Sequence, residues 1–384
     1  MYIFQKNKLK IWLGSFVFVG LLFPLQLSYA AIETKAKQAY MFCPQTGTVL
    51  LDHNGDEMSP PSSMTKIMTA YMVFERLKSG ELNLDDEFPV SKLAWRKGGS
   101  KMFVEVGSHV SIDDLLRGII VHSGNDACIV VAEGLAGNEG VFAADMTQKA
   151  KELGATNTTF KNSTGWPDPM HMSTVKDLAI ISQRLMDEFP DLYKTYFSLP
   201  EFTYNGIRQE NRNPLLRRNM GVDGLKTGST DAGGYGIVVS GVQNGQRLIL
   251  VVNGLKTASE RAVEAEQLLT WGFRNYVTPC FFKKGEEVVK TNVWIGNKPQ
   301  VSLVVDRDVY VTMNRNEAKD MVVQAIYDEP IDVSRIGQIV GKIVIQLPNR
   351  DPIEVPLRAE GDVQSAGFFT RIKSALYYLA WGHN

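Results

Sequence analysis

A serine and a lysine three positions apart, Ser63 and Lys66, are the first residues whose types and spacing could do covalent chemistry. Pro60 and Pro61 precede them, so a helix is expected to begin at or near Ser63. Residues three apart share one helix face, which lets the Lys66 amine reach the Ser63 hydroxyl. The lysine could take the serine proton if burial, a helix amino terminus or a second ammonium lowered its pKa well below about 10.4. The alternative is a helix-capping serine beside a surface lysine.

Two triplets further along the chain carry the residue types that such a serine needs around it. The SGN triplet at 123–125 precedes an expected helix, and its hydroxyl and amide could face one cleft; the alternative is an ordinary helix cap. The KTG triplet at 226–228 comes just before two expected strands and offers a cation and a hydroxyl for an anionic group. Its alternative is an edge-strand lysine with a turn glycine. Each triplet is weak alone, but the ordered set SxxK, SxN and KTG is the signature of serine β-lactamases and penicillin-binding proteins.

The elements that must position these residues mix helices and strands as far as about residue 274. Apolar residues recur at helical spacing in Met64–Leu77. Further helices are expected over Asp113–Ile120, Asp126–Leu135, Phe142–Leu153 and Glu260–Phe273. Strands are expected over Tyr235–Gly241 and Leu248–Val252, with Asn244-Gly245 as the hairpin turn between them.

A change of composition then predicts a second, all-β domain at about residues 278–362. Short runs rich in β-branched residues alternate there with turn residues, which is typical of strands. The runs are Val301–Val305, Val309–Met313, Val322–Ile326, Ile339–Ile345 and Ile353–Leu357.

The composition is that of a globular protein. Hydrophobic residues make up 44% of the chain and charged residues 22%, which excludes a mostly disordered protein. The net charge of −1 lacks the basic excess of a dedicated nucleic-acid binder. Three cysteines are too few for a disulfide scaffold, and five scattered histidines form no metal-binding motif. We therefore expect no metal, no other cofactor and no nucleic-acid partner.

The amino terminus has the pattern of a secretory signal peptide. Lys6, Lys8 and Lys10 form a positive region, and Ile11–Leu25 is an almost unbroken apolar run. Small residues then stand before Ala31, which is typical of a cleavage site after residue 30. The sequence predicts a protein that works outside the cytoplasm; the alternative is an uncleaved membrane anchor.

The carboxy-terminal segment, residues 364–384, is expected to form an amphipathic helix. Its apolar residues gather on one helical face, and Arg371 and Lys373 lie outside that face. The apolar part is too short and too interrupted to span about 30 Å of hydrocarbon, so a helix lying in the plane of an anionic membrane surface is the better interpretation. The alternative is a helix docked on the β-rich domain.

With these motifs in view, the chain resembles the low-molecular-mass penicillin-binding proteins, the serine-type D-Ala-D-Ala carboxypeptidases of bacterial cell-wall metabolism (peptidase family S11). The resemblance extends over nearly the whole chain and beyond the three motifs. Other stretches that look like this family are Gly99–Phe103, Leu116–Ala127, Asn211–Asn213, Val222–Gly228 and Leu268–Arg274. The resemblance implies a mixed α/β (α+β) fold of the transpeptidase and β-lactamase type, with a five-stranded antiparallel sheet between helices.

The resemblance also implies catalytic roles for individual residues. Ser63 would be the acylated nucleophile, Lys66 its proton acceptor, and Ser123 the group that relays a proton to the leaving D-Ala. Asn125 would bond the substrate amide, and the main-chain N–H groups of Ser63 and Ser229 would form the oxyanion hole. Many members have histidine where this chain has Ser229, which leaves the substrate preference or the rate open.

Substrate binding is assigned by the same resemblance. Lys226 and Thr227 would hold the region of the substrate's terminal carboxylate, with Gly228 beside them. Arg212 and Arg261 match family positions that assist carboxylate binding, and a structural ion pair is the equal alternative for both.

The implied function is removal of the terminal D-Ala from peptidoglycan stem pentapeptides, with acylation and inhibition by β-lactam antibiotics. The expected organisation is a signal peptide (1–30), a peptidase domain (31–276), a β-rich domain (277–363) and the membrane-surface helix (364–384), in a periplasmic protein on the outer face of the inner membrane. One alternative is a class A β-lactamase, which needs a carboxylate to activate the deacylating water; the loop Thr159–Ser173 holds Asp168 but no Glu. The other is a penicillin-binding sensor or scaffold without catalysis.

Three residues near the motifs are expected to be structural. Cys128 is interpreted as a small buried hydrophobic residue, although its nearness to the site would allow modification by thiol reagents. Asp168 and His171 lie in a loop that resembles a family loop at the border of the site, and a structural role is favoured over a catalytic one.

Overall fold

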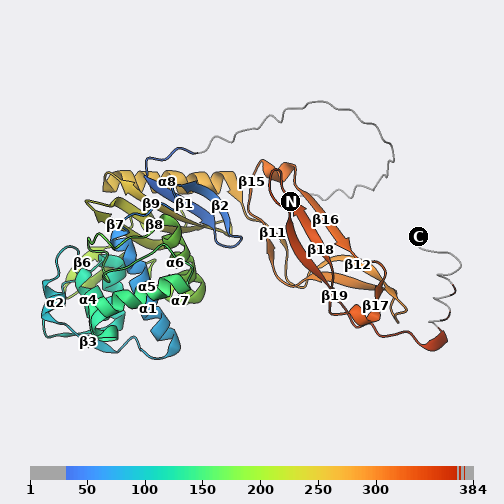
Figure 1. Ribbon diagram of the computed structural model, residues 1–384, viewed down its shortest axis with the longest axis horizontal. Helices are drawn as coiled ribbons and strands as arrows, with labels where there is room; N and C mark the ends of the chain where they lie inside the picture. Colours follow the sequence, from blue (N-terminus) through green and yellow to red (C-terminus); the bar gives the residue numbers. More distant parts are fainter. Residues whose placement is uncertain (1–31, 370–371, 373–375, 377–384) are drawn as a thin grey trace. The chain divides into compact units, whose positions relative to one another are not determined.

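A computed structural model describes residues 32–369 together with Ile372 and Leu376 (Figure 1). All of the helices and strands below lie in the unit Thr34–Asn384. The expected signal peptide, its cleavage site and most of the expected tail helix lie outside the described residues.

A five-stranded antiparallel sheet forms the centre of the first domain, as the resemblance implies. Its strand order is β2-β1-β9-β8-β7. The strands are β1 (Gln38–Cys43), β2 (Thr48–His53), β7 (Val222–Thr230), β8 (Gly234–Gln243) and β9 (Gln246–Leu255). The predicted hairpin joins β8 to β9, and Asn244 and Gly245 both take positive φ, the backbone of the favoured two-residue turn.

Helices cover both faces of this sheet, which explains the continuous apolar runs of its strands (Figure 1). Helix α8 (Ala258–Asn275) lies on one face, where Gly272 approaches Leu248 so closely that a Cβ would stand 2.8 Å from its Cδ1. The alternate residues Ile249 and Val251 belong to the core on the other face. The sheet therefore joins two apolar layers.

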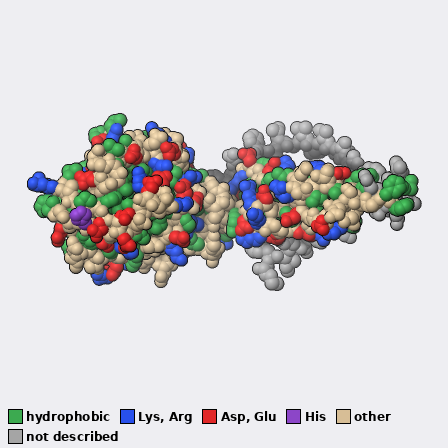
Figure 2. Space-filling view, turned by 90° about the horizontal axis from the view of Figure 1, so that it is seen from below, with side chains coloured by type: hydrophobic (Ala, Val, Ile, Leu, Met, Phe, Trp, Pro, Cys, Tyr) green, Lys and Arg blue, Asp and Glu red, His purple; other side chains and the backbone are tan. Residues whose placement is uncertain are grey.

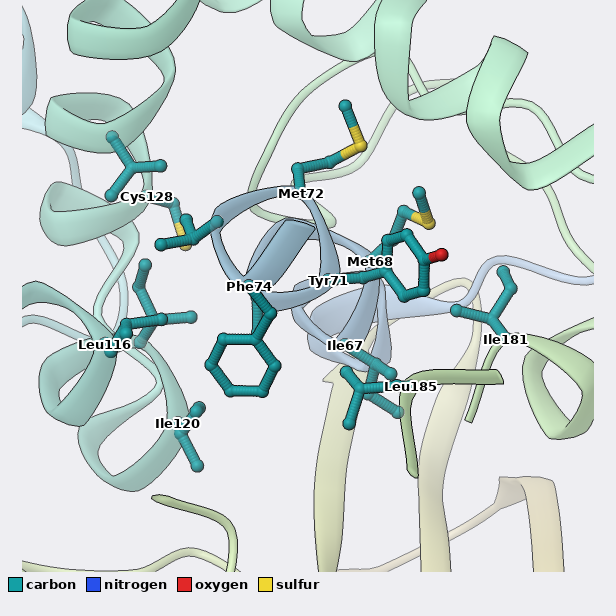
Figure 3. Packing of buried hydrophobic residues seen from close by; sticks show 14 of the residues in the cluster. Ile67, Met68, Tyr71, Met72, Phe74, Leu116, Ile120, Cys128, Ile181 and Leu185 are labelled. Atoms are coloured by element: carbon teal, nitrogen blue, oxygen red, sulfur yellow. The ribbon is translucent and has the colours of Figure 1, made fainter. Parts of the chain in front are cut away.

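Helix α1 (Lys66–Ser79) is the central helix of the larger layer, and nine consecutive residues from Lys66 to Phe74 are buried. Figure 3 shows Ile67, Tyr71 and Phe74 pointing among side chains from the surrounding helices. The helix ends where Gly80 adopts a left-handed backbone with φ of 78°. Because these nine residues are consecutive, the first half of α1 is buried on all sides, and the residues at its start are held firmly.

The remaining elements of this domain surround α1 and the site. The helices are α2 (Lys92–Arg96), α3 (Ile112–Arg117), α4 (Asn125–Ala136), α5 (Glu139–Glu152), α6 (Val175–Glu188) and α7 (Pro190–Tyr196). Two small hairpins pair β3 (Glu87–Pro89) with β4 (His109–Ser111) and β5 (Glu201–Tyr204) with β6 (Ile207–Glu210).

A second, β-rich region follows residue 276, as the composition predicts. Its six-stranded sheet has the order β16-β18-β19-β13-β12-β17, and its apolar core is built from residues such as Leu303, Ile343 and Leu357. The strands are β12 (Glu287–Trp294), β13 (Gln300–Val305), β16 (Val322–Tyr327), β17 (Ile331–Asp332), β18 (Ile339–Gln346) and β19 (Ile353–Glu360). Short strand pairs complete it: β10 (Tyr276–Val277) with β15 (Met313–Asn314), and β11 (Cys280–Phe282) with β14 (Val309–Tyr310).

The KTG triplet precedes the hairpin strands β8 and β9, as expected, and itself lies inside the edge strand β7, which was not predicted. Two local expectations were wrong. The expected helix Asp113–Ile120 changes at Gly118 into a π-helix, Gly118–His122. The expected strand Val309–Met313 is divided between β14 and β15.

The described surface mixes charges of both signs, as the face in Figure 2 shows. Among the described residues no single helix has the length and hydropathy of a membrane span. The consecutive helices α4 and α5 meet both criteria only when they are taken as one pair, which is bent by 84°. Of the expected tail helix, Phe368 and Phe369 are described, and their exposed fractions are 71% and 85%.

Candidate active site

The Ser63 hydroxyl and the Lys66 amine lie 3.0 Å apart, as the spacing predicts. Ser63 sits in a short 3₁₀ turn, Ser62–Thr65, and α1 itself begins at Lys66. The Lys66 Nζ also donates to the Asn125 Oδ1 at 2.8 Å and to the Thr164 carbonyl at 2.6 Å. These three acceptors fix the amine in a side chain that is 1% exposed, so Lys66 is not a surface lysine.

Burial is the main cause that lowers the pKa of Lys66, to about 8. The positive charge of Lys97 lowers it further, whereas Cys128 and Asp126 act in the opposite direction. At this pKa about a tenth of the lysine is neutral at pH 7, whereas an unperturbed lysine is almost fully protonated, and a neutral amine is the condition for a proton acceptor.

Three chain segments meet at the Ser63 backbone. Ser62 has a positive φ of 51°, and its hydroxyl lies 3.0 Å from the Thr230 hydroxyl of β7. A Cβ on Gly228 would stand 3.1 Å from the Ser63 nitrogen, and one on Gly165 only 1.8 Å from the Ser62 oxygen. Glycine is therefore required at both positions for β7 and the 165 loop to approach the nucleophile.

The SGN triplet is not an ordinary helix cap. Ser123 follows the π-helix with a left-handed φ of 59°. Gly124 occupies the N-cap position of α4, and because it has no side chain it makes no capping hydrogen bond. Asn125 is the first residue of α4, and its Nδ2 donates to the Gly98 carbonyl at 2.9 Å. The triplet thus faces Lys66 and connects it to the segment at Gly98.

Asp126 secures the neighbouring loop. Its carboxylate accepts the main-chain N–H groups of Met102 and Phe103, each at 2.8 Å, and of Val104 at 3.3 Å. Phe103 has a positive φ of 69°, so the loop turns sharply around this carboxylate. The sequence motif did not indicate this role for the residue after Asn125.

Lys226 is fully buried within β7, 2% exposed, and its Nζ donates to the Thr227 carbonyl at 3.2 Å. Burial lowers its pKa well below the usual range, and the charges of Lys66 and Arg212 add to the effect. A buried, desolvated ammonium among other cations is a site that an anion would stabilise strongly.

The two arginines line the same cavity as the motifs. Neither Arg212 nor Arg261 forms an ion pair within the described part of the chain. Arg261 lies over the Tyr235 ring at 5.8 Å, and its buried Nε has no hydrogen-bond partner. The structural ion pair considered for these residues is therefore not seen among residues 32–369.

The cavity has a volume of about 500 Å³ and brings together residues from all of these segments. Its lining comprises Ser63, Gly99, Ser100, Ser123, Asn125, Thr164, Gly165, Trp166, Pro167, Arg212, Thr227, Gly228, Ser229, Thr230, Asp231, Tyr235, Ala258 and Arg261. Lys66 and Lys226 lie behind this lining. No group of three or more His, Cys, Asp or Glu that could hold a metal ion occurs in the part of the chain that the structure describes.

Sequence reasoning placed the 159–173 loop at the border of the site but missed Thr164, whose carbonyl accepts a hydrogen bond from Lys66. Asn162 organises this loop: its Oδ1 accepts the N–H groups of Thr164, Gly165 and Trp166, and its Nδ2 donates to the Trp166 carbonyl. An asparagine two to four residues before a glycine is a local turn signal, but nothing in the sequence shows that the turn faces Lys66.

His171 and Cys128 are both buried, which agrees with the structural roles expected for them. The His171 Nδ1 accepts the Lys161 N–H at 3.1 Å, so the proton lies on Nε2 and points to the Thr65 hydroxyl at 2.9 Å. Burial lowers the pKa of His171 to about 4, so the ring is neutral, and raises the pKa of the Cys128 thiol to about 12. Asp168 is exposed, and its Oδ1 accepts the Met170 N–H at 2.7 Å.

Comparison with known proteins agrees with this geometry. A family model described as D-alanyl-D-alanine carboxypeptidase matches residues 26–257, and one described as the C-terminal domain of penicillin-binding protein 5 matches residues 276–365. D-alanyl-D-alanine carboxypeptidase DacC of Escherichia coli is 38% identical over 366 residues, covering 93% of this chain and 91% of the relative.

Two solved structures are similar to the chain. Penicillin-binding protein 5 of Haemophilus influenzae has a TM-score of 0.77 at 34% identity, covering 87% of this chain and 99% of the other. Penicillin-binding protein D2 of Listeria monocytogenes in its ampicillin-bound form has a TM-score of 0.57 at 31% identity, covering 62% and 97%. The chain therefore belongs to the D-alanyl-D-alanine carboxypeptidase family of serine-type peptidases.

Proposed function

We propose that this protein removes the terminal D-Ala from peptidoglycan stem pentapeptides through an acyl-enzyme on Ser63. The observation that carries the proposal is the 3.0 Å contact between the Ser63 hydroxyl and Lys66, a buried amine whose pKa is lowered to about 8. A hydroxyl paired with a base that is partly neutral near pH 7 is an activated nucleophile.

The surroundings of Lys66 orient it as a base. A neutral amine keeps two N–H bonds and one lone pair. The Asn125 Oδ1 and the Thr164 carbonyl can take the two N–H groups, and the lone pair then faces the Ser63 O–H. Ser63 attacks the carbonyl of the penultimate D-Ala, Lys66 accepts the hydroxyl proton, and the negative charge of the tetrahedral intermediate is stabilised by the N–H groups of Ser63 and Ser229.

Collapse of that intermediate breaks the amide bond. Ser123 relays the proton to the departing amine, and the terminal D-Ala leaves with the Ser63 ester still in place. A water molecule then attacks the ester carbonyl, and its proton returns through the same groups to Ser63. Acid and base roles are thus exchanged between the two halves of the reaction.

Recognition of the substrate's carboxylate rests on the cationic side of the cavity. Lys226, Thr227, Arg212 and Arg261 supply buried or unpaired donors there, and Gly228 allows the substrate backbone to approach β7. A carboxylate would compensate the crowded positive charge that lowers the pKa of Lys226. β-Lactam antibiotics, which carry a carboxylate beside a strained amide, fit the same cavity and acylate Ser63; the ampicillin-bound relative supports this expectation.

We also propose where the protein works. The signal pattern in residues 1–30 would direct it to the periplasm, and the apolar face of the helix in residues 364–384 would hold it on the outer face of the inner membrane. The exposed Phe368 and Phe369 support the second part. The peptidase domain would comprise residues 31–276 and the β-rich domain residues 277–363.

Incubation of the mature protein with a pentapeptide ending in D-Ala-D-Ala, followed by mass spectrometry, tests the reaction. We expect a product shorter by one alanine. Acylation by penicillin without peptide turnover would instead indicate a non-catalytic sensor, and rapid turnover of penicillin would indicate a β-lactamase.

A further inference from the structure

An aromatic ring in the wall of the cavity forms a pair with a lysine beside it. Trp166 lines the cavity and is 42% exposed. The Lys97 ammonium lies over its ring, 4.7 Å from the centroid. Lys97 forms no ion pair with any residue that the structure describes. The pair therefore offers an apolar plane and a positive charge without a partner.

The pair is built into the site through Asn125. The Asn125 Nδ2 donates to the Gly98 carbonyl, and a Cβ on Gly99 would stand 2.8 Å from that Nδ2 and 3.1 Å from the Trp166 Cζ3. Segment 97–99 thus lies between Asn125 and Trp166. The charge of Lys97 is also close enough to lower the pKa of Lys66.

The position identifies which part of a substrate would reach the pair. In the proposed function Ser63 attacks the penultimate D-Ala, and the resemblance assigns to Asn125 a bond to the substrate amide. We take this to be the amide that joins the penultimate D-Ala to the residue before it. The preceding residue of a stem peptide is a diamino acid with a long side chain. Because Trp166 and Lys97 adjoin Asn125, they are placed to contact that side chain.

We propose that Trp166 and Lys97 form a subsite for this third residue of the stem peptide and favour a side chain whose methylene stem ends in a carboxylate. The indole would cover the methylene groups, and the Lys97 ammonium would pair with the carboxylate. A side chain that ends in an ammonium alone would meet an unpaired like charge. Diaminopimelate ends in a carbon that carries both a carboxylate and an ammonium, so its carboxylate can pair with Lys97, whereas lysine has no carboxylate there. This inference rests on the proposed function.

The experiment compares kcat/KM for three pentapeptides that differ only in the third residue: meso-diaminopimelate, its side-chain carboxamide, and L-lysine. We expect kcat/KM for the diaminopimelate peptide to exceed that for its carboxamide by roughly fivefold, which is the upper range for one partly exposed charge pair. The lysine peptide should have the lowest kcat/KM. In Lys97→Met the preference should fall to about one. The ratio is the readout because any change in the pKa of Lys66 affects all three peptides equally.

Two further variants complete the test. Lys92→Met removes an exposed charge from the start of α2, the helix that ends just before Lys97, and should keep the wild-type preference because Lys92 does not line the cavity. Trp166→Leu should lower kcat/KM for all three peptides while the preference remains. Equal kcat/KM values in the wild type, or an unchanged preference in Lys97→Met, would overturn the subsite. Failure of the wild type to cleave any of the peptides would instead refute the proposed function.

Discussion

The rate of Ser63 acylation should rise with pH because only neutral Lys66 can accept the serine proton. Burial lowers the pKa of this lysine to about 8. The neutral fraction is then about one hundredth at pH 6, about a tenth at pH 7 and about half at pH 8. The second-order acylation rate constant should therefore increase about tenfold from pH 6 to pH 7 and level off above pH 8.

Stopped-flow measurement with a fluorescent penicillin gives this rate constant directly, and far-UV circular dichroism over the same pH range verifies that the protein stays folded. The matched variant is Lys66→Arg, which keeps the positive charge but stays protonated at every accessible pH. Its acylation should be slower by roughly 10³-fold, the usual contribution of a general base. A rate that is flat from pH 6 to pH 8, or an arginine variant near the wild-type rate, would refute Lys66 as the base.

Three other predictions use separate features of the chain. Ser63→Ala should abolish both D-Ala release and covalent labelling by penicillin while the melting temperature stays near wild type; a labelled variant would place the nucleophile elsewhere. Asn162→Ala should lower the free energy of unfolding by about 3 kcal/mol in urea titration, because the buried donors of its loop lose their acceptor; a change below about 1 kcal/mol would contradict this. Deletion of residues 368–384 should move the mature protein to the soluble periplasmic fraction with activity on a small peptide retained, and a truncated protein that pellets with membranes would point to another anchor.

Local spacing predicted those parts of the site that depend on one element. The approach of Lys66 to Ser63 follows from their positions on one turn. The other two hydrogen-bond partners of Lys66, Asn125 and Thr164, belong to α4 and to a loop distant in the sequence. No periodicity in the sequence indicates which carbonyl will face a buried amine. The three motifs together predicted the family, because the whole set rarely occurs by chance.

Strand β7 was missed for a physical reason. Its sequence, VDGLKTGST, lacks the alternation of apolar and polar residues that marks a strand, because Gly224, Lys226 and Gly228 interrupt it. The glycine at 228 is needed for close approach to Ser63, and the lysine is buried for binding. The needs of the site thus replace the strand pattern of alternating residues at this edge of the sheet. Most strands of the β-rich region, whose apolar residues form its core, were predicted from that pattern.

The position of β1 in the central sheet has a consequence for how the chain folds. Strand β1 lies between β2 and β9, and Met41 pairs with Leu250. Its neighbour β9 is thus synthesised near the end of the domain, after the segments that supply Ser63, Ser123 and Lys226. Closing so long a loop slows folding, and an emerging chain must keep the apolar face of the β1–β2 hairpin uncovered until β9 is complete. A growing chain that ends before Gln246 would therefore carry every catalytic motif and still lack a finished active site.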